Sequence, residues 1–468
     1  MTTARTYTAP TPPLPSYEGR VVALDAVLAA RDARVARQQA MLAQGGVLLS
    51  LTLVAPGAVK RSPLLDAIFA AALAALRPLV DDARARIEAV DDSGHHALYL
   101  LDGEARDWKT RMLALENRAP LSRLWDIDII GGDGVAVSRR DLGLPPRRCL
   151  ICDDDAKTCA RERRHSINAL QADITHRYRL HQQAQAIAET MRQALITEAT
   201  LTPKAGLVDA AHNGGHTDMN LALFLKSADA IAPYLGDCAA AGMTFAASPA
   251  SPAILAAIRP IGIAAEAAMR AATGGVNTHK GAIFAFGLTA AALGKRLAAQ
   301  GTTTLAEIQD DIRAISAGLL AELQQPGEDS AGKRGYARHG IRGARGEAAS
   351  GYTTVTRHAL PAYRQALAAD GNTRRALLAA LVALYAANDD STTLARVGLD
   401  GLRAHQHWAR QLLADRATLA DETRLADAIA AYARDCAARR LSAGGSADLL
   451  ALTVWCGQHF TPNPGTPL

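Results

Sequence analysis

The strongest constraint on how this chain folds is a change in its hydrophobic pattern near residue 166. Before that point, short apolar stretches of strand length, at residues 47–55, 96–101 and 124–130, alternate with helix-like segments such as residues 63–79. After it, nearly every apolar segment repeats at intervals of three and four residues, which is typical of amphipathic helices. The pattern therefore predicts an α+β N-terminal domain followed by an all-α C-terminal domain.

The length of the chain supports the same division. Its 468 residues exceed what one hydrophobic core usually holds. We expect a flexible tail rich in Pro and Thr over residues 1–18. The α+β domain should follow over residues 19–172, and the helical domain over residues 173–468.

Composition and charge indicate a soluble globular protein. Hydrophobic residues form 49% of the chain and the net charge is +5, which permits nucleotides and CoA-like ligands without requiring nucleic acid. No apolar run approaches the ~20 residues needed to span a membrane, and the N-terminus lacks the apolar core of a secretory signal. The six cysteines are too sparse for a disulfide framework. We therefore expect a cytoplasmic protein with reduced thiols and no membrane or nucleic-acid partner.

A block of cysteines and arginines spans residues 147–166, with the sequence RRCLICDDDAKTCARERRHS. The spacing of its thiol and imidazole groups could close tetrahedrally around Zn²⁺, and the four candidate ligands are Cys149, Cys152, Cys159 and His165. The alternative is a set of reduced cysteines beside a positively charged loop. The interleaved guanidinium groups suit bidentate binding of phosphate, unless they form only a solvated basic face.

A second candidate site lies in the strand predicted at residues 124–130. Asp126 and Asp128 are two residues apart, so they point to the same face of a strand. Adjacent carboxylates repel each other unless a cation lies between them, and Mg²⁺ that bridges nucleotide phosphates is the obvious candidate. The alternative is an exposed edge strand with an acidic face. The apolar residues that flank both acids indicate burial of the opposite face, which favours the magnesium site.

The pattern R-x-C-L-x-C-x-x-x-A-x-x-C-x-R-x-R-R-H-S at residues 147–166 resembles the citrate lyase holo-acyl-carrier-protein synthase family. The similarity extends to ARQQAML at residues 36–42, SLTLVAPGAVK at residues 50–60 and RLWDIDII at residues 123–130. The resemblance implies that a phosphoribosyl-dephospho-CoA group is transferred to a serine hydroxyl on the acyl carrier subunit of citrate lyase, with pyrophosphate as the leaving group.

For this transfer, Asp126 and Asp128 would hold Mg²⁺, and positively charged groups would neutralise the attacked phosphate. The candidates for that second role are Arg123, Arg163 and Arg164, with Arg147 as a further substrate-binding residue. His165 is either a zinc ligand or the base that activates the carrier serine. These two roles exclude each other if they need the same ring nitrogen.

Three polar blocks interrupt the helical half. The first comprises TPKAGLVD and HNGGHTDMN at residues 202–220, the second is GGVNTHKG at residues 274–281, and the third is GARGEAASGY at residues 343–352. Glycines and a lysine at a helix start suit an anion, and the acids can bind Mg²⁺ or transfer protons. The alternatives are ordinary helix caps and turn carboxylates.

Taken in order, PK-x-GLVD, GGHTDM, GVNTHKG-x-IF and ARGEA-x-x-GY resemble the triphosphoribosyl-dephospho-CoA synthase family, from about residue 182 to the C-terminus. This resemblance implies an all-helical fold and a reaction in which the 2′-hydroxyl of 3′-dephospho-CoA displaces adenine from the ribose of ATP. Two departures stand out: Ala205 replaces an expected proline, and a late D-T-N block is represented only by residues 388–391.

The expected chemistry is analogous to glycoside cleavage, with an oxocarbenium-like transition state at the anomeric carbon. Adenine must gain a proton as it leaves, the attacking hydroxyl must lose one, and our candidates for these transfers are Asp218 and Glu347. Lys204 and Lys280 would hold the triphosphate. The remaining substrate-binding candidates, which would orient the triphosphate or assist proton transfer, are His216, Asn277 and His279.

The two implied activities are consecutive, because the product of the helical half is the substrate of the first half. The sequence therefore predicts a bifunctional enzyme that uses ATP, 3′-dephospho-CoA and the citrate lyase acyl carrier subunit. One alternative is a zinc-knuckle nucleic-acid-binding protein with a helical partner domain, although the chain lacks the interleaved aromatic residues on which bases stack. Another is a hydrolase of ADP-ribose-type glycosidic bonds.

Overall fold

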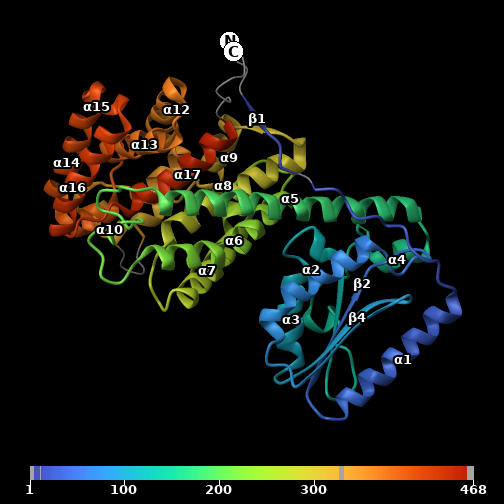
Figure 1. The fold of residues 1–468 in the computed structure, drawn as a ribbon. Coiled ribbons are helices and arrows are strands. Elements are labelled where there is room, and N and C mark those ends of the chain that lie inside the picture. Colours follow the sequence, from blue (N-terminus) through green and yellow to red (C-terminus); the bar gives the residue numbers. More distant parts are fainter. Residues whose placement is uncertain (1–4, 11, 153, 326–330, 461–468) are drawn as a thin grey trace. The chain divides into compact units, whose positions relative to one another are not determined.

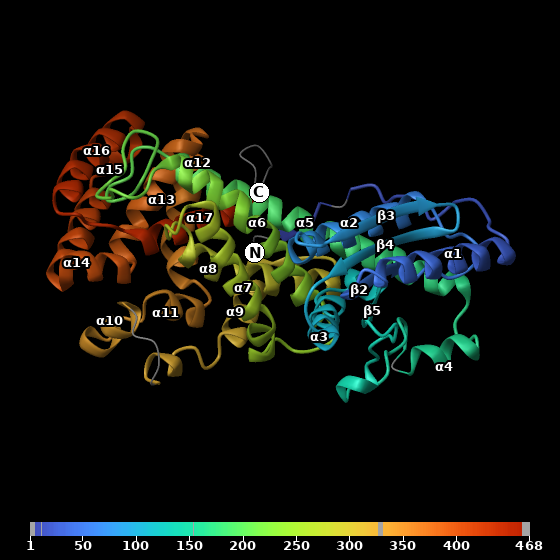
Figure 2. The same cartoon turned by 90° about the horizontal axis from the view of Figure 1, so that it is seen from below.

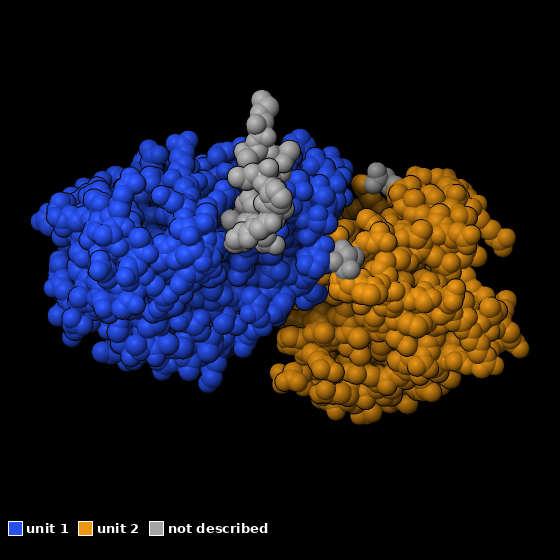
Figure 3. Space-filling view, turned by 45° about the horizontal axis from the view of Figure 1, so that its top comes forward, with its two compact units in different colours: residues 1–10, 184–468 blue, residues 11–183 orange. Residues whose placement is uncertain are grey.

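The computed structural model describes residues 5–10, 12–152, 154–325 and 331–460 (Figures 1 and 2). The chain forms two compact units: one comprises residues 11–183, and the other comprises residues 1–10 together with residues 184–468 (Figure 3). Helix α5 (Ile167–Thr200) runs through the division. The structure therefore divides the chain between residues 183 and 184, inside one continuous helix, whereas the sequence pattern placed the boundary at residues 172–173.

The smaller unit is built on an antiparallel sheet with the strand order β3-β4-β2-β5. Its strands are β2 (Val47–Leu53), β3 (Ala85–Asp91), β4 (Gly94–Leu101) and β5 (Trp125–Ile130). Strands β2, β4 and β5 confirm the three predicted strands. Strand β3 was not predicted, and it lies at the edge of the sheet, where only alternate residues are partly buried.

Helices cover the two faces of this sheet unequally. Helices α2 (Pro63–Val80) and α3 (Ala105–Glu116) lie on one face and α1 (Leu24–Leu42) lies on the other (Figure 1). The α2–α3 side holds the main hydrophobic core, whereas the apolar cluster under α1 is small and contains Met41, Leu48, Leu98 and Leu100. The rest of the α1 face is therefore available to polar side chains. A short helix, α4 (Ala156–Arg161), follows in the cysteine-rich loop.

The larger unit is almost entirely helical and matches the predicted all-α domain. Its first helices are α6 (Leu221–Met243), α7 (Pro252–Ala272), α8 (Lys280–Gln300), α9 (Leu305–Ile315), α10 (Ala331–His339) and α11 (Gly343–Ser350). They are followed by α12 (Leu360–Asp370), α13 (Thr373–Ala387), α14 (Ser391–Ala414), α15 (Arg416–Ala420), α16 (Glu422–Ala438) and α17 (Gly444–Phe460). Helices α10, α11 and α17 were not predicted.

Glycines set the close approach of α6 and α8, the helices that carry part of the candidate site. A side-chain carbon at Gly242 would overlap the backbone of Ala291, and one at Gly294 would overlap the backbone of Ala239. Only glycine fits where two helix backbones come this close. This contact fixes the position of α8, and therefore of its first turn.

The N-terminal residues differ from the expected flexible tail. Thr6–Tyr7 forms strand β1, which pairs antiparallel with β6 (Thr303–Thr304) in the helical unit. The Tyr7 ring is buried, and its centroid lies 5.8 Å from that of Trp455. Burial of an aromatic ring stabilises the ordered segment and offsets the backbone entropy that is lost.

Three helices correct the expectation that no apolar segment reaches membrane-spanning length. Helices α2, α7 and α8 are long and apolar enough to cross a membrane by length and composition. Most of α8 is buried inside the helical unit, which accounts for its apolar character, whereas α7 leaves more of its surface uncovered. The exposed apolar side chains of α7 include Ile263, which is 64% exposed.

Candidate active sites

The paired aspartates of the smaller unit lie on the face of the sheet that α1 covers. In the register of β5 against β2, Asp126 is opposite Thr52 and Asp128 is opposite Ser50. Both carboxylates are exposed while the intervening Ile127 is buried, so the predicted alternation is confirmed. Although the Asp128 side chain reaches solvent, desolvation by the surrounding protein, and then the like charge of Asp126, raises the pKa of its carboxyl. Such repulsion is relieved by a cation.

Helix α1 brings polar and cationic side chains to the same face. The Gln38 amide donates to Ser50 Oγ at 3.0 Å, and Arg37 contacts the His96 ring at 3.0 Å. Arg34 is close enough for both aspartates to influence its pKa, which burial lowers. A nucleotide phosphate approaching the aspartates would therefore meet arginine from the helix and carboxylate from the sheet.

Arg147 links the cysteine-rich loop to strand β5. Its guanidinium donates to Asp126 Oδ1 at 2.7 Å and to the carbonyl oxygens of Arg123 and Trp125 at 2.7 and 2.8 Å. Arg123 in turn donates to the Arg148 carbonyl at 2.8 Å. Of the predicted phosphate-binding residues, Arg123 and Arg147 therefore hold the loop against the aspartates.

The other two predicted arginines lie on the surface of this loop. Arg164 pairs with Asp154 and with Glu162. Arg163 is exposed and adopts a left-handed backbone conformation with φ of 50°. This conformation is uncommon for a residue other than glycine. Neither residue contacts Asp126 or Asp128 through an interaction that the structure shows.

The predicted cysteine and histidine ligands do come together. One donor atom from each of Cys149, Cys152, Cys159 and His165 lies within 4.8 Å of all the others. The sulfur atoms of Cys152 and Cys159 are 3.8 Å apart, and His165 Nε2 lies 3.3 Å from the Cys152 sulfur. Such a cluster could hold a metal ion, and hydrogen bonds from neighbouring groups lower the pKa of the Cys149 thiol against the effect of burial.

In the helical unit, four helices begin around adjoining cavities. Helix α8 begins at Lys280, α11 at Gly343, α14 at Ser391 and α17 at Gly444, and each first turn contributes to a cavity wall. Helix N-termini favour anions because they present free N–H groups and the positive end of the dipole. Two of the cavities, of about 370 and 440 Å³, share the lining residues Asn277, Lys280, Gly281, Thr392 and Asp448.

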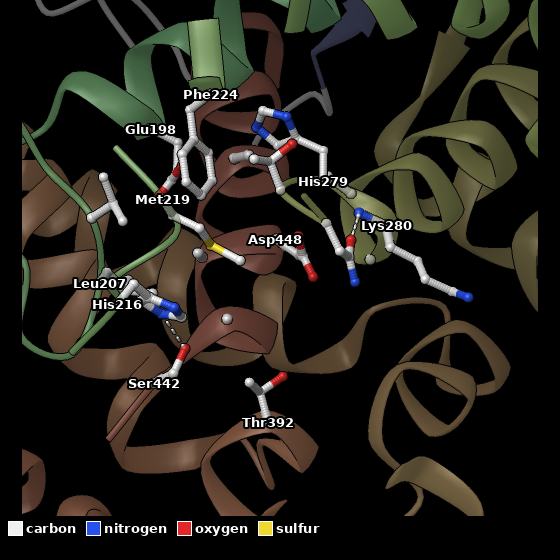
Figure 4. Close-up of a pocket in the computed structure, with 18 of the residues that line it drawn as sticks. Glu198, Leu207, His216, Met219, Phe224, His279, Lys280, Thr392, Ser442 and Asp448 are labelled. Atoms are coloured by element: carbon white, nitrogen blue, oxygen red, sulfur yellow. Dashed lines mark hydrogen bonds between the residues drawn. The ribbon is translucent and has the colours of Figure 1, made fainter. Parts of the chain in front are cut away.

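Asp448 occupies the boundary between these two cavities, and its carboxylate points into the space beside Thr392 (Figure 4). It accepts a hydrogen bond from the Ala282 backbone N–H in the first turn of α8. Burial, followed by the charges of Asp390 and Glu198, raises its pKa well above the usual range. Gly281 makes room for it, because a side-chain carbon there would overlap the carboxylate.

Further acids surround the 440 Å³ cavity. Glu347 accepts a hydrogen bond from Thr354 at 2.6 Å through one oxygen, while its other oxygen is buried without a hydrogen-bond partner. Burial raises the pKa of this carboxyl. Asp390 caps α14 and accepts from the Ser446 N–H at 2.7 Å, so it joins the starts of α14 and α17. Residues 388–391, the weak late block of the sequence, line the same cavity as Glu347.

The buried basic residues of the 370 Å³ cavity already have protein partners. Lys204 is 1% exposed and its ammonium donates to Glu198 Oε1 at 2.6 Å. The His279 ring contacts Ser227 Oγ at 2.7 Å, and burial lowers its pKa to about 3, so it is neutral. His216 Nε2 lies 3.0 Å from Ser442 Oγ, and burial lowers its pKa (Figure 4).

The remaining predicted residues occupy more open positions. Lys280 is half exposed, pairs with Glu266 at 3.1 Å, and extends its side chain away from the centre of the cavity (Figure 4). Asn277 Oδ1 accepts from the Lys280 backbone N–H at 3.2 Å. Asp218 is exposed, lies 3.9 Å from His216 Nδ1, and lines neither cavity. Of the two predicted proton-transfer residues, Glu347 lines the cavity that also holds Asp390 and Asp448, whereas Asp218 does not.

Sequence reasoning missed Asp448 and Glu198. Asp448 follows a Gly-Gly-Ser stretch and precedes a long apolar run, the same combination that marked the other polar blocks, and could have been found on that basis. Glu198 lies near the end of α5, and no feature of its surroundings in the sequence distinguishes it. Glu347 lies within helix α11, so the alternative interpretation of this residue as a turn carboxylate does not apply.

The two domains thus carry two different candidate sites: one domain pairs aspartates with arginines, and the other surrounds an acidic cavity with helix N-termini. Comparison with known proteins identifies both parts. Residues 184–462 match the family described as ATP:dephospho-CoA triphosphoribosyl transferase, and residues 22–181 match the family described as apo-citrate lyase phosphoribosyl-dephospho-CoA transferase.

Individual relatives agree with the family matches. The protein CitXG of Haemophilus influenzae is 40% identical over 457 residues, covering 94% of this chain and 97% of its own length. The 2-(5''-triphosphoribosyl)-3'-dephosphocoenzyme-A synthase of Pectobacterium atrosepticum is 44% identical over 297 residues, covering 62% of this chain and 95% of its own length. The chain therefore belongs to the triphosphoribosyl-dephospho-CoA synthase family, fused to the apo-citrate lyase transferase family, and is a bifunctional transferase. The nucleic-acid-binding and hydrolase alternatives are not favoured.

Proposed function

We propose that the helical unit binds the triphosphate of ATP at the N-termini of α8, α14 and α17. The observation that carries this proposal is the convergence of these helix starts on a cavity that also holds Asp390 and Asp448. A bare polyphosphate would be repelled by the carboxylates, whereas one carrying Mg²⁺ would be attracted to both groups. Mg²⁺ would neutralise phosphate charge there, and Lys280, at the edge of the cavity, would contribute a further cation.

In the reaction that follows, the 2′-hydroxyl of dephospho-CoA forms a bond to the anomeric carbon of the ATP ribose. The bond from that carbon to adenine breaks, the hydroxyl proton passes to a base, and adenine receives a proton from an acid. We assign the base to Asp448, because its carboxylate accepts a hydrogen bond from the Ala282 N–H at the start of α8, a contact that favours the charged form against the effect of burial. We assign the acid to Glu347, because its unpartnered buried oxygen favours the protonated form.

The two roles can be separated by the choice of leaving group. Adenine methylated at N7 leaves as a neutral base and needs no acid, so 7-methyl-ATP should restore most of the activity lost in Glu347→Gln. The same substrate should not restore Asp448→Asn, because the attacking hydroxyl still needs a base. Rates of base release by chromatography provide the measurement. Rescue of Asp448→Asn but not Glu347→Gln would reverse the assignment, and rescue of neither would remove Glu347 from proton transfer.

For the smaller unit we propose that Asp126 and Asp128 hold Mg²⁺ against the phosphates of the triphosphoribosyl group. Mg²⁺ would stabilise the charge that develops on the departing pyrophosphate. Arg147 already contacts Asp126, so it is placed to contact a phosphate bound at the same carboxylate. The acceptor would be a serine hydroxyl on the citrate lyase acyl carrier subunit. Mass spectrometry of that subunit tests this step, and Asp128→Asn should leave its mass unchanged.

We further propose that the cluster of Cys149, Cys152, Cys159 and His165 binds Zn²⁺ and has a structural role. Three thiol groups and one imidazole match the donor set of closed structural zinc sites. A bound ion would fix the conformation of this loop. It would thereby also fix the position of Arg147, which lies in the same loop and contacts Asp126. None of the six cysteines, all of which the structure describes, forms a disulfide, which agrees with our proposal that the protein works in the reducing cytoplasm. If His165 binds the metal through Nε2, the carrier serine must lose its proton to another group.

A further inference from the structure

A third cavity, of about 540 Å³, opens beside the candidate triphosphate site. It lies among α7, α8, α11 and the short helix η3 (Ala321–Leu323), and it shares Lys280 and Gly281 with the two cavities already described. Its volume is in the range of small-molecule sites. Because Lys280 lines all three cavities, a ligand that fills the third would have one end near the proposed binding site for the ATP triphosphate.

The wall of this cavity is apolar, while its rim is charged. Leu255, Ile258, Ile263 and Phe284 form part of the wall. The Ile263 side chain is 64% exposed, an arrangement that leaves apolar surface uncovered next to a cavity. At Gly262, a side-chain carbon would meet no atom within 4 Å, so there is open space over this part of α7.

The rim carries ion pairs rather than isolated charges. Lys280 pairs with Glu266 at 3.1 Å, and Glu322 pairs with Arg259 at 2.6 Å and lies 3.8 Å from Arg345. A diphosphate at this rim could replace the carboxylate partners of the cations. The site is therefore suited to a ligand with an uncharged, largely apolar arm that joins a diphosphate.

We propose that this cavity binds the pantetheine arm of dephospho-CoA, with the adjoining diphosphate at Lys280 and Arg345. This inference rests on the proposed function, which requires dephospho-CoA and ATP together. Dephospho-CoA contains an uncharged arm of this kind, whereas ATP does not. The adenosine of ATP fits the 370 Å³ cavity better, because that cavity offers Asn277, His216 and Ser442 as polar groups.

The variant Gly262→Leu tests the site by filling it. Gly262 lies inside helix α7 with a helical backbone, so leucine also improves helix propensity, by up to about 1 kcal/mol. The matched control is Ala264→Leu, which adds a leucine at an exposed position of the same helix that does not line the cavity. Two acceptors are compared: dephospho-CoA, and ADP, which has the same adenosine diphosphate without the arm.

We expect Gly262→Leu to raise the KM for dephospho-CoA by at least about tenfold, while the KM for ATP and the rate of adenine release with ADP in place of dephospho-CoA stay at their wild-type values. Calorimetric binding of dephospho-CoA should weaken by the same factor, and Ala264→Leu should behave as wild type. An unchanged KM for dephospho-CoA in the folded variant would overturn the inference. A raised KM for ATP alone would place adenosine in the cavity and would also overturn it. If wild type binds dephospho-CoA but releases no adenine, the proposed function fails, and the binding comparison alone still decides the inference.

Discussion

The substitution Gly281→Ala isolates the role of Asp448 without removing any polar group. A methyl carbon at Gly281 would overlap Asp448 Oδ2 and lie 2.8 Å from its Cγ. Ordinary separations between such atoms are about 3.5–4.0 Å. The carboxylate must therefore retreat by roughly 1 Å, away from the first turn of α8.

The expected effect on the rate follows from that displacement. A 1 Å misplacement of a reacting group can cost about 10²-fold in rate, which corresponds to ~2.7 kcal/mol in the activation barrier. Stability should move the other way or stay the same, because alanine is favoured over glycine in a helix by up to about 1 kcal/mol. Gly281→Ala should thus release adenine about 100 times more slowly while its thermal midpoint does not fall.

Initial rates of adenine release, measured by chromatography, and thermal unfolding by circular dichroism provide the two readouts. The control is the same substitution in an Asp448→Ala background, where the methyl group no longer meets a carboxylate. There Gly281→Ala should have almost no further effect, so the two substitutions should be strongly non-additive. A folded Gly281→Ala variant with nearly wild-type activity, or an equal loss in both backgrounds, would refute the reasoning.

Three further predictions concern stability and metal binding. Asp448→Asn should raise the thermal midpoint more in alkaline than in acidic buffer. Burial raises the pKa of this carboxyl, so the stability that it costs is greatest above the raised pKa, shrinks as the pH falls below it, and is gone once the pH is below the ordinary carboxyl pKa. A gain that grows toward low pH would contradict this. Lys204→Met should lower the free energy of unfolding by about 3–5 kcal/mol in denaturant titrations, because it leaves the Glu198 carboxylate buried without its partner, and adding Glu198→Leu should recover much of that loss. Cys152→Ser should reduce zinc content, measured by atomic spectroscopy, and slow transfer to the carrier while adenine release stays at the wild-type rate; unchanged metal content would remove Cys152 from the site.

The order of strands and helices could be predicted where hydrophobic periodicity was strong. Strand β3 was missed because its charged residues alternate with small ones, so it contributes little apolar surface. Helices α11 and α17 begin with or contain glycines, which favour turns in isolation, and tertiary packing overrides that preference. Residues Thr6–Tyr7 looked like a tail because the strand that they meet lies about 300 residues away.

The candidate sites show the same limit. The four zinc-ligand candidates lie close in sequence, and their clustering could be predicted from spacing alone. Glu347 was also identified, but its neighbour across the cavity, Asp448, comes from a helix that the sequence did not reveal. Lys204 looked available for phosphate because its partner Glu198 lies on a preceding helix, and an ion pair of this kind is visible only in three dimensions.

The central claim, that one chain makes the prosthetic group and then attaches it, is tested most directly by a single incubation. Purified protein is mixed with ATP, Mg²⁺, dephospho-CoA and the apo acyl carrier subunit of citrate lyase, and adenine, pyrophosphate and the intact mass of the carrier are measured together. We predict that the carrier gains the mass of one phosphoribosyl-dephospho-CoA group, with equal amounts of adenine and pyrophosphate, and only when dephospho-CoA is present. Adenine release that does not depend on dephospho-CoA, or a carrier of unchanged mass despite adenine release, would contradict the account.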